Sequence, residues 1–187
     1  MRDTTLSERA LILAPRGRDA PIAAAILQEA GIRAQPCTSL PALIEQLNIG
    51  AAFVIVTEEN LVTADLAPLV AWLGEQENWS DLPFVLLTSG GGGLERHPRA
   101  RRFLDIQGNV TFVERPFHPT TLVSIARAAL RARRRQYEAR ARLEALHESE
   151  TRYRALFENI DEGFCIIEFI DGPHGPLSDY IHVEANP

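Results

Sequence analysis

A pair of carboxylates that follows an apolar run offers the first candidates for chemistry in this sequence. Residues 51–60 read AAFVIVTEEN, which places Thr57, Glu58 and Glu59 directly after the apolar residues. Carboxylates at such a position can bind a divalent cation or accept a phosphoryl group, whereas a threonine hydroxyl cannot form an acyl phosphate. Aligning the run by its apolar residues puts Thr57 at the end of a strand and leaves the two glutamates in a solvated loop. A slip of one residue would put Glu58 there instead, but it would also invert which side chains face inward.

Five apolar runs of strand length alternate with segments of helical period and would position these residues. The runs cover residues 10–15, 32–37, 51–57, 82–89 and 109–117. The helical segments begin near Asp19, Ser39, Leu66, residue 100 and Pro119. Continuous apolar runs are typical of strands in a parallel sheet that is covered on both faces. We therefore predict a parallel sheet with helices on both faces and functional loops at the carboxyl ends of the strands.

The helix that begins at Pro119 meets no Gly or Pro before Gly163, so nothing in the backbone forces it to end. Its apolar residues keep a seven-residue spacing, which is typical of a coiled coil. We expect it to form a parallel dimer with its own copy; the alternative is a single solvated helix held by Arg and Glu pairs. The predicted contact residues are Leu122, Ile125, Ala129, Ala132, Gln136, Leu143, Leu146 and Tyr153.

Two strand-like runs, 164–170 and 180–185, flank the turn-rich segment DGPHGPLSD. This pattern predicts a β-hairpin, and an isolated hairpin is marginal in water. The apolar side chains of the first run find no partner in the remaining residues. We therefore expect the sequence to stop inside a domain.

Composition and charge argue against several classes of function. The chain is 45% hydrophobic and 24% charged, as in globular proteins, and its net charge of -6 argues against nucleic-acid binding. No apolar run approaches the roughly 20 residues that cross a bilayer, and the first residues lack signal-peptide features, so we expect a cytoplasmic protein without membrane insertion. Cys37 and Cys165 lie far apart, and the histidines lack ligand spacing. We expect neither a metal nor a cofactor.

Residues 8–125 resemble the receiver domain of two-component response regulators. LPFVLLTS resembles the family's fourth strand, with Thr88 at the switch hydroxyl position, and VERPFHPTTL resembles its Lys-Pro-Phe turn before the last helix. The resemblance implies a flavodoxin-like (βα)5 fold with strand order 2-1-3-4-5. It also implies an acid pair that holds magnesium after the first strand, a phosphoacceptor Asp at the end of the third and a Lys after the fifth.

The sequence departs from the family at each of these chemical positions. Ala14 and Pro15 follow the first strand, Thr57 ends the third, and Arg115 stands in place of the Lys. We predict a degenerate phosphoacceptor pocket of Thr57, Glu58, Thr88 and Arg115 without a catalytic residue. Two alternatives stay open: Glu58 acts as an atypical phosphate acceptor, or its fixed charge mimics a switched state.

A second resemblance is to the start of a PAS domain. RYRALFENIDEGFCIIE is similar to that family's entry helix, loop and first strand, and YIHVEANP to its second strand. A receiver, a long helix and a PAS domain together resemble the N-terminal part of bacterial sensor histidine kinases. We predict a receiver-like domain over residues 1–118, a last helix continuing as a coiled-coil linker over 119–150, and a truncated PAS start over 151–187.

The implied function is a regulatory and dimerisation module of a phosphorelay, with a possible partner signalling protein on the receiver surface. Any enzymatic activity would belong to an effector beyond residue 187. The resemblance implies a protein histidine kinase, and the alternative is a cyclic-di-nucleotide cyclase or phosphodiesterase.

Overall fold

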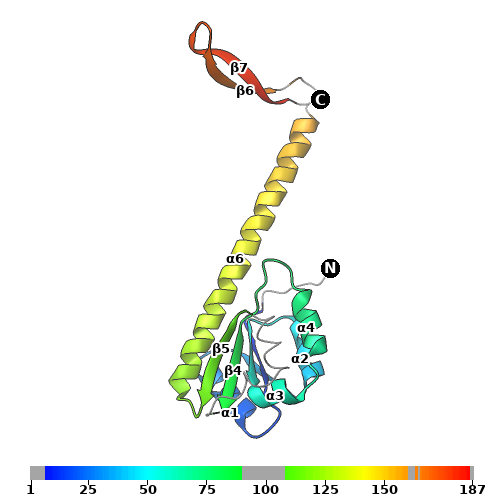
Figure 1. The fold of residues 1–187 in the computed structure, drawn as a ribbon, viewed down its shortest axis with the longest axis vertical. Coiled ribbons are helices and arrows are strands. Elements are labelled where there is room, and N and C mark those ends of the chain that lie inside the picture. The colour runs from blue at the N-terminus through cyan, green and yellow to red at the C-terminus, as the bar shows by residue number, and fades with distance from the viewer. Residues whose placement is uncertain (1–6, 90–107, 160–162, 164, 186–187) are drawn as a thin grey trace. The chain divides into compact units, whose positions relative to one another are not determined.

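The computed structural model describes residues 7–89, 108–159, 163 and 165–185. The chain divides into two compact units, residues 1–139 and residues 140–187 (Figure 1). We call the first unit the sheet domain. Among the described residues, no helix combines the length and the apolar character that spanning a membrane requires.

The sheet domain contains the predicted five-stranded parallel sheet. Its strands are β1 (Ala10–Leu13), β2 (Ala34–Cys37), β3 (Phe53–Thr57), β4 (Phe84–Ser89) and β5 (Val110–Arg115), in the order β2-β1-β3-β4-β5. Each adjacent pair is parallel, which confirms the predicted sheet and strand order. In this register Thr57 lies beside Leu87, and Ser89 lies beside Arg115. The carboxyl ends of the central strands therefore bring the predicted pocket residues to one edge of the sheet.

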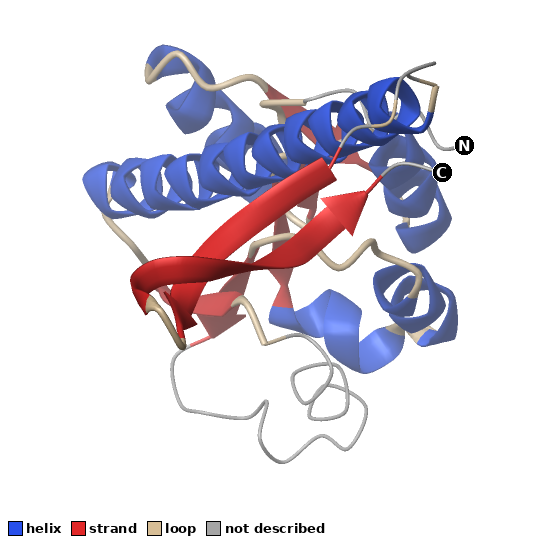
Figure 2. Cartoon of the chain, turned by 90° about the horizontal axis from the view of Figure 1, so that it is seen from above, coloured by secondary structure: helices blue, strands red, loops and turns tan. Residues whose placement is uncertain are grey.

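Helices cover both faces of this sheet, and each face has its own apolar core (Figures 1 and 2). One face packs against α2 (Leu40–Ile49), α3 (Glu58–Thr63) and α4 (Ala67–Gly74). The other packs against α1 (Asp19–Glu29) and the first turns of α6 (Pro119–Glu158). Burial of β1, β3 and most of β4 on both faces explains why these strands read as continuous apolar runs in the sequence.

Residues 58–63 form helix α3, where the sequence predicted a solvated loop. The helix is short, and Leu61 is its only buried apolar residue, so it carries no helical periodicity that sequence reasoning could detect. Glu58 is its first residue and is buried at 8% exposure. The shorter helix predicted near residues 100–104 lies outside the described residues.

Helix α6 is continuous from Pro119 to Glu158, as the absence of Gly and Pro suggested. Its first turns pack into the sheet domain through Leu122, Ala126 and Ala129, with Ile125 partly buried against the same core. From residue 141 to residue 156, every side chain is exposed. Three predicted dimer contacts, Leu122, Ile125 and Ala129, thus belong to the domain's own core. Because Leu122 and Ala129 are buried in this core, they cannot also contact a second copy, and the predicted dimer contacts that stay available lie further along the helix.

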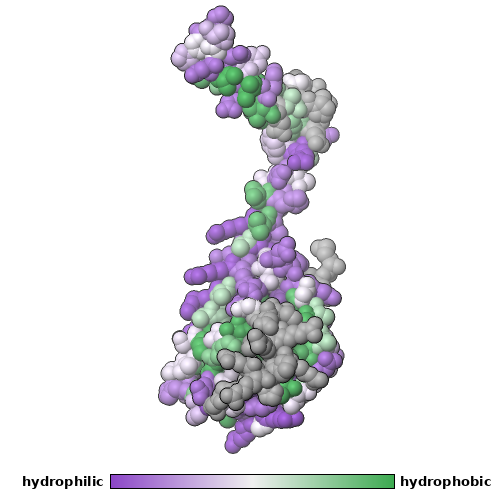
Figure 3. Space-filling view, viewed as in Figure 1, coloured by the Kyte–Doolittle hydropathy of each residue, from purple (hydrophilic) through white to green (hydrophobic). Residues whose placement is uncertain are grey.

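The second unit contains an antiparallel pair, β6 (Cys165–Gly172) and β7 (Gly175–Ala185). This is the predicted hairpin; a PAS domain is not shown, because a single strand pair is all the sheet that the described residues of this unit form. Large apolar side chains remain on its surface, among them Phe169 at 57% and Val183 at 58% exposure (Figure 3).

Candidate functional site

The end of β3 carries a threonine whose hydroxyl already has a partner. Thr57 is 4% exposed, and its Oγ1 accepts a hydrogen bond of 2.6 Å from Asn60 Nδ2 on α3. The same amide nitrogen donates to the Leu13 carbonyl at the end of β1, at 3.3 Å. Asn60 therefore joins the ends of two neighbouring strands. The hydroxyl itself offers no carboxylate for acyl phosphate formation.

Glu58 is the buried carboxylate nearest to this position, and it is bonded to the neighbouring strand. Its Oε2 accepts hydrogen bonds from the Ser89 backbone N–H and from Ser89 Oγ, both at 3.0 Å. Glu58 also lies in the first turn of α3, where the helix dipole favours a negative charge. The side chain thus has a structural role that ties α3 to the end of β4.

Arg115 occupies the remaining position of the predicted pocket and joins two acidic side chains. Its Nη1 donates to Asp19 Oδ2 at 2.6 Å, and its Nη2 donates to Glu59 Oε1 in a very short contact. Its Nε donates to the Thr88 carbonyl at 3.4 Å. One guanidinium therefore links the start of α1, α3 and the end of β4 through all three of its nitrogens.

These ion pairs shift the pKa values of Glu59 and Arg115. Burial by itself would raise the pKa of Glu59, but hydrogen bonds from Arg115, from its own backbone N–H and from Thr57 hold that pKa below its ordinary value. Burial by itself would lower the pKa of Arg115, but its hydrogen bonds to Glu59 and Asp19 raise that pKa. Both groups are therefore charged at neutral pH, and Arg115 places a positive charge of the protein itself between Asp19 and Glu59.

The arrangement does not resemble an open cation site. Among the described residues, no group of three or more His, Cys, Asp or Glu side chains could hold a metal ion. Ala14 and Pro15 follow β1 and supply no side-chain oxygen. The two acids that do converge, Asp19 and Glu59, direct their oxygens at the Arg115 guanidinium. The geometry therefore provides fixed ion pairs where magnesium would need free carboxylate oxygens.

The structure brings together all four residues of the predicted pocket and adds partners that the sequence did not indicate. Ser89 and Asn60 fix Glu58 and Thr57, and Asp19 and Glu59 close on Arg115. Asp19 and Arg115 are separated by 96 positions in the chain, so only the fold reveals their contact. One of these partners could have been suspected from the sequence: Ser89 directly follows Thr88, so it lies at the same end of the fourth strand.

The other predicted residues lie along α6. Leu143, Leu146 and Tyr153 are exposed at 62%, 66% and 46%. Gln136, by contrast, pairs with the sheet domain: its amide donates to the Asp81 carbonyl at 2.7 Å and its oxygen accepts from the Asp81 N–H at 3.1 Å. Ala132 is partly buried. The seam available to a partner therefore begins after Gln136.

No family model matches the sequence, and neither does any curated protein. Solved structures do resemble it. NtrX from Brucella abortus in complex with ATP aligns with a TM-score of 0.55 and 20% identity, over 71% of this chain and 28% of that chain. Full-length FixJ from B. japonicum aligns with a TM-score of 0.54 and 18% identity, over 74% of this chain and 64% of that chain.

A response regulator receiver modulated diguanylate cyclase from Pelobacter carbinolicus aligns with a TM-score of 0.50 and 16% identity, over 71% of this chain and 99% of that chain. This chain spans less than two thirds of both NtrX and FixJ, at the 28% and 64% given above. At these identities the likeness concerns the fold. The sheet domain has the flavodoxin-like fold of response regulator receiver domains.

Proposed function

We propose that this chain is a regulatory and dimerisation module of two-component signalling whose receiver-like domain has lost phosphotransfer. The receiver-type fold supports the signalling role. The observation that carries the loss of chemistry is the state of the pocket: Thr57 ends β3, and Arg115 is paired with both Asp19 and Glu59. A phosphoryl group would meet no acceptor carboxylate at Thr57 and no free acid pair beside it.

Beryllofluoride with magnesium tests this proposal on the intact chain by amide NMR. Beryllofluoride mimics a phosphoryl group bound to a carboxylate, and we expect no saturable shift at Thr57, Thr88 or Arg115. A receiver that retains its acceptor Asp serves as the positive control. Saturable, magnesium-dependent shifts clustered at these three residues would overturn the proposal.

Glu58 is the alternative acceptor, because it is the buried carboxylate next to Thr57. Two hydrogen bonds from Ser89 hold its Oε2, so nucleophilic attack would require the loss of both bonds or the use of the other oxygen. The variant Glu58→Gln decides between the two functions in the same NMR experiment. If shifts appear in the wild type and vanish in this variant, Glu58 accepts the phosphoryl group and the alternative holds.

We further propose that α6 pairs in parallel with a second copy and transmits a conformational change from the sheet domain to a sensor and effector. The exposed Leu143, Leu146 and Tyr153 support the pairing. The similarity of residues 152–168 to the start of a PAS domain supports a sensor, and a protein histidine kinase is the effector that this order of domains favours. A coiled coil can adopt nearby registers or rotations, and a partner signalling protein on the sheet domain would favour one of them by about 1 to 3 kcal/mol.

The effector is tested on the product of the whole gene. ATP-dependent autophosphorylation on a histidine is expected for a kinase. The diguanylate cyclase among the similar structures motivates the alternative, and synthesis of a cyclic dinucleotide from GTP without autophosphorylation would favour it.

A further inference from the structure

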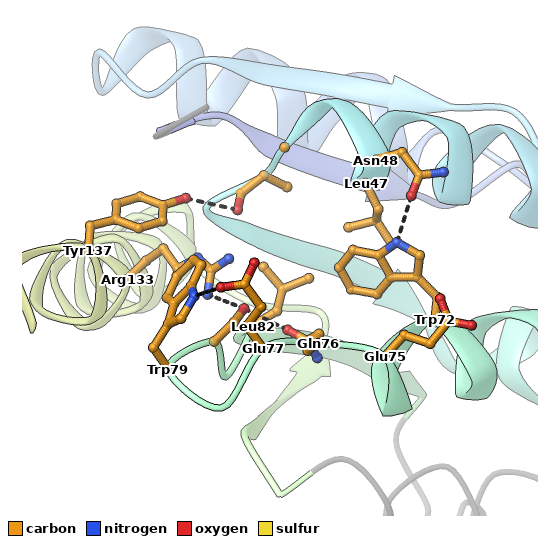
Figure 4. A pocket seen from close by; sticks show the side chains of 13 residues that line it. Leu47, Asn48, Trp72, Glu75, Gln76, Glu77, Trp79, Leu82, Arg133 and Tyr137 are labelled. Atoms are coloured by element: carbon orange, nitrogen blue, oxygen red, sulfur yellow. Dashed lines mark hydrogen bonds between the residues drawn. The ribbon is translucent and has the colours of Figure 1, made fainter. Parts of the chain in front are cut away.

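A buried arginine on α6 has no acidic partner in the described part of the chain. Arg133 is 4% exposed, and none of the described carboxylates forms an ion pair with it. Its guanidinium carbon lies 5.2 Å from the centre of the Trp79 ring and 4.9 Å from the centre of the Tyr137 ring. Two aromatic faces thus hold the charge in place (Figure 4). A buried charge without a counterion is unusual and requires an explanation.

The hydrogen bonds of Arg133 use only one side of the guanidinium. Nη1 donates to Ser80 Oγ at 2.9 Å and to Gln136 Oε1 at 2.6 Å. Nε is buried and has no partner within the described part of the chain. Unsatisfied buried donors are costly and therefore rare. The edge formed by Nε and Nη2 is the edge through which an arginine binds a carboxylate with two parallel hydrogen bonds.

Arg133 lines a cavity of about 70 Å³ at the edge of the sheet where β3 and β4 begin, away from the Arg115 cluster at their carboxyl ends. Apolar surface comes from Leu47, Leu82, Trp72 and Trp79 (Figure 4). A space of this size holds several water molecules or one small organic molecule. An apolar wall with one oriented charge is a typical composition for a small-molecule site.

We propose that this cavity binds a small organic monocarboxylate, with its apolar part against Trp72 and Leu82 and its carboxylate at the Arg133 guanidinium. Because Nε itself is covered, binding requires the Arg133 side chain to shift so that its Nε edge opens to the cavity. Exposed Glu75 and Glu77 lie on the rim, so a second negative charge on the ligand would be repelled. Glu77 accepts a hydrogen bond of 2.5 Å from Trp79 Nε1, and this bond holds the Glu77 carboxylate at the rim. A ligand in this cavity would contact α6 at Arg133 and Tyr137, near the end of the sheet domain at residue 139. The proposal does not depend on whether phosphotransfer occurs at the opposite edge of the sheet.

Tryptophan fluorescence of the intact chain reports on this cavity directly, because both tryptophans of the sequence line it. We would titrate propionate and butyrate at constant ionic strength, with propionamide and butyramide as neutral isosteres. The acids should give a saturable change with a dissociation constant on the order of 1 mM, and the amides none. Inorganic phosphate should bind more weakly than the acids.

Two variants attribute the signal to the guanidinium. Arg133→Gln should weaken binding about tenfold or more, and Arg135→Gln, the same change on an exposed position of the helix, should leave it unchanged. Arg133→Lys keeps the positive charge but lacks the Nε edge, so it should also lose binding. This variant replaces Arg133→Gln in the test if Arg133→Gln does not fold. A purely structural Arg133 predicts no saturable response to either acid. The absence of a saturable response would overturn the proposal. So would an equal response to the amides, tighter binding of phosphate than of the acids, or full affinity in folded Arg133→Lys.

Discussion

Arg115 is an internal cation at the end of β5, and it pairs with the acidic side chains that converge there. Its two carboxylate partners come from α1 and α3, and the three side chains are only partly buried, at 22% exposure for Arg115, 33% for Asp19 and 42% for Glu59. Ion pairs with this exposure stabilise a fold modestly, by about 1 kcal/mol or less each. Their main effect in this account is to occupy the acids and to fix α3 in one position.

Removing this cation should give a pH-dependent loss of stability. Arg115→Gln should lower the free energy of unfolding by about 1 kcal/mol at neutral pH, because Asp19 and Glu59 lose their partner. The folded-state pKa of Glu59 is depressed, so its contribution is complete above the unfolded value of about 4.3 and is lost as pH falls through the folded value. Urea unfolding of the wild type and Arg115→Gln measures the difference in unfolding free energy between them, which should be smaller near pH 3 than at neutral pH.

Arg152→Gln is the matched control, since Arg152 forms a pair with Glu148 at 71% and 73% exposure. This variant should match the wild type at both pH values. A destabilisation by Arg115→Gln that is the same at neutral and acidic pH would refute the assigned role of Glu59.

Helix α6 combines two packing periods. Its inner stripe is Leu122, Ala126, Ala129, Arg133 and Tyr137, which advances by three or four residues as a straight helix on a globular core does. A seven-residue repeat agrees with this stripe at Leu122 and Ala129 but then predicts Gln136 in place of Arg133 and Tyr137. Sequence reasoning followed the seven-residue repeat, and therefore missed the two residues that dock the helix beside Trp79.

The docked and exposed parts of α6 should respond differently to the same substitution. Leu122→Ala removes a side chain with 0% exposure and should cost about 2 to 5 kcal/mol of unfolding free energy. Leu146→Ala changes a side chain with 66% exposure and should stay within about 0.5 kcal/mol. Urea unfolding at low protein concentration, followed by tryptophan fluorescence, checks both values. Equal losses for the two variants would contradict the boundary near residue 139.

The exposed part of α6 should govern association. Light scattering should give the wild type about twice the 20.8 kDa mass of one chain, and Leu143→Asp should shift the protein to the monomer, because a charge in the seam is costly to bury. Ala141→Asp places the same charge on the outer side of the same turn and should leave the dimer intact. A monomeric wild type would refute helix pairing.

At the scale of the whole molecule, the fold was predictable and the site only in part. The central strands, buried on both faces, produce apolar runs such as ALIL and FVIVT, and the alternation of such runs with helical segments predicts a parallel sheet. The closure of Arg115 on Asp19 and Glu59 depends on side-chain directions at three separate elements, and no local pattern encodes it. The hairpin was predicted from its turn residues, and its PAS context stays a prediction.

The central proposal is that an otherwise ordinary receiver-type fold has lost covalent phosphotransfer. Incubation of the intact chain with acetyl phosphate and magnesium, followed by mass measurement of the whole protein, tests this claim most directly. We predict no added phosphoryl group under conditions in which a receiver with its acceptor Asp is fully modified. A stoichiometric gain of one phosphoryl group in mass would contradict the proposed loss.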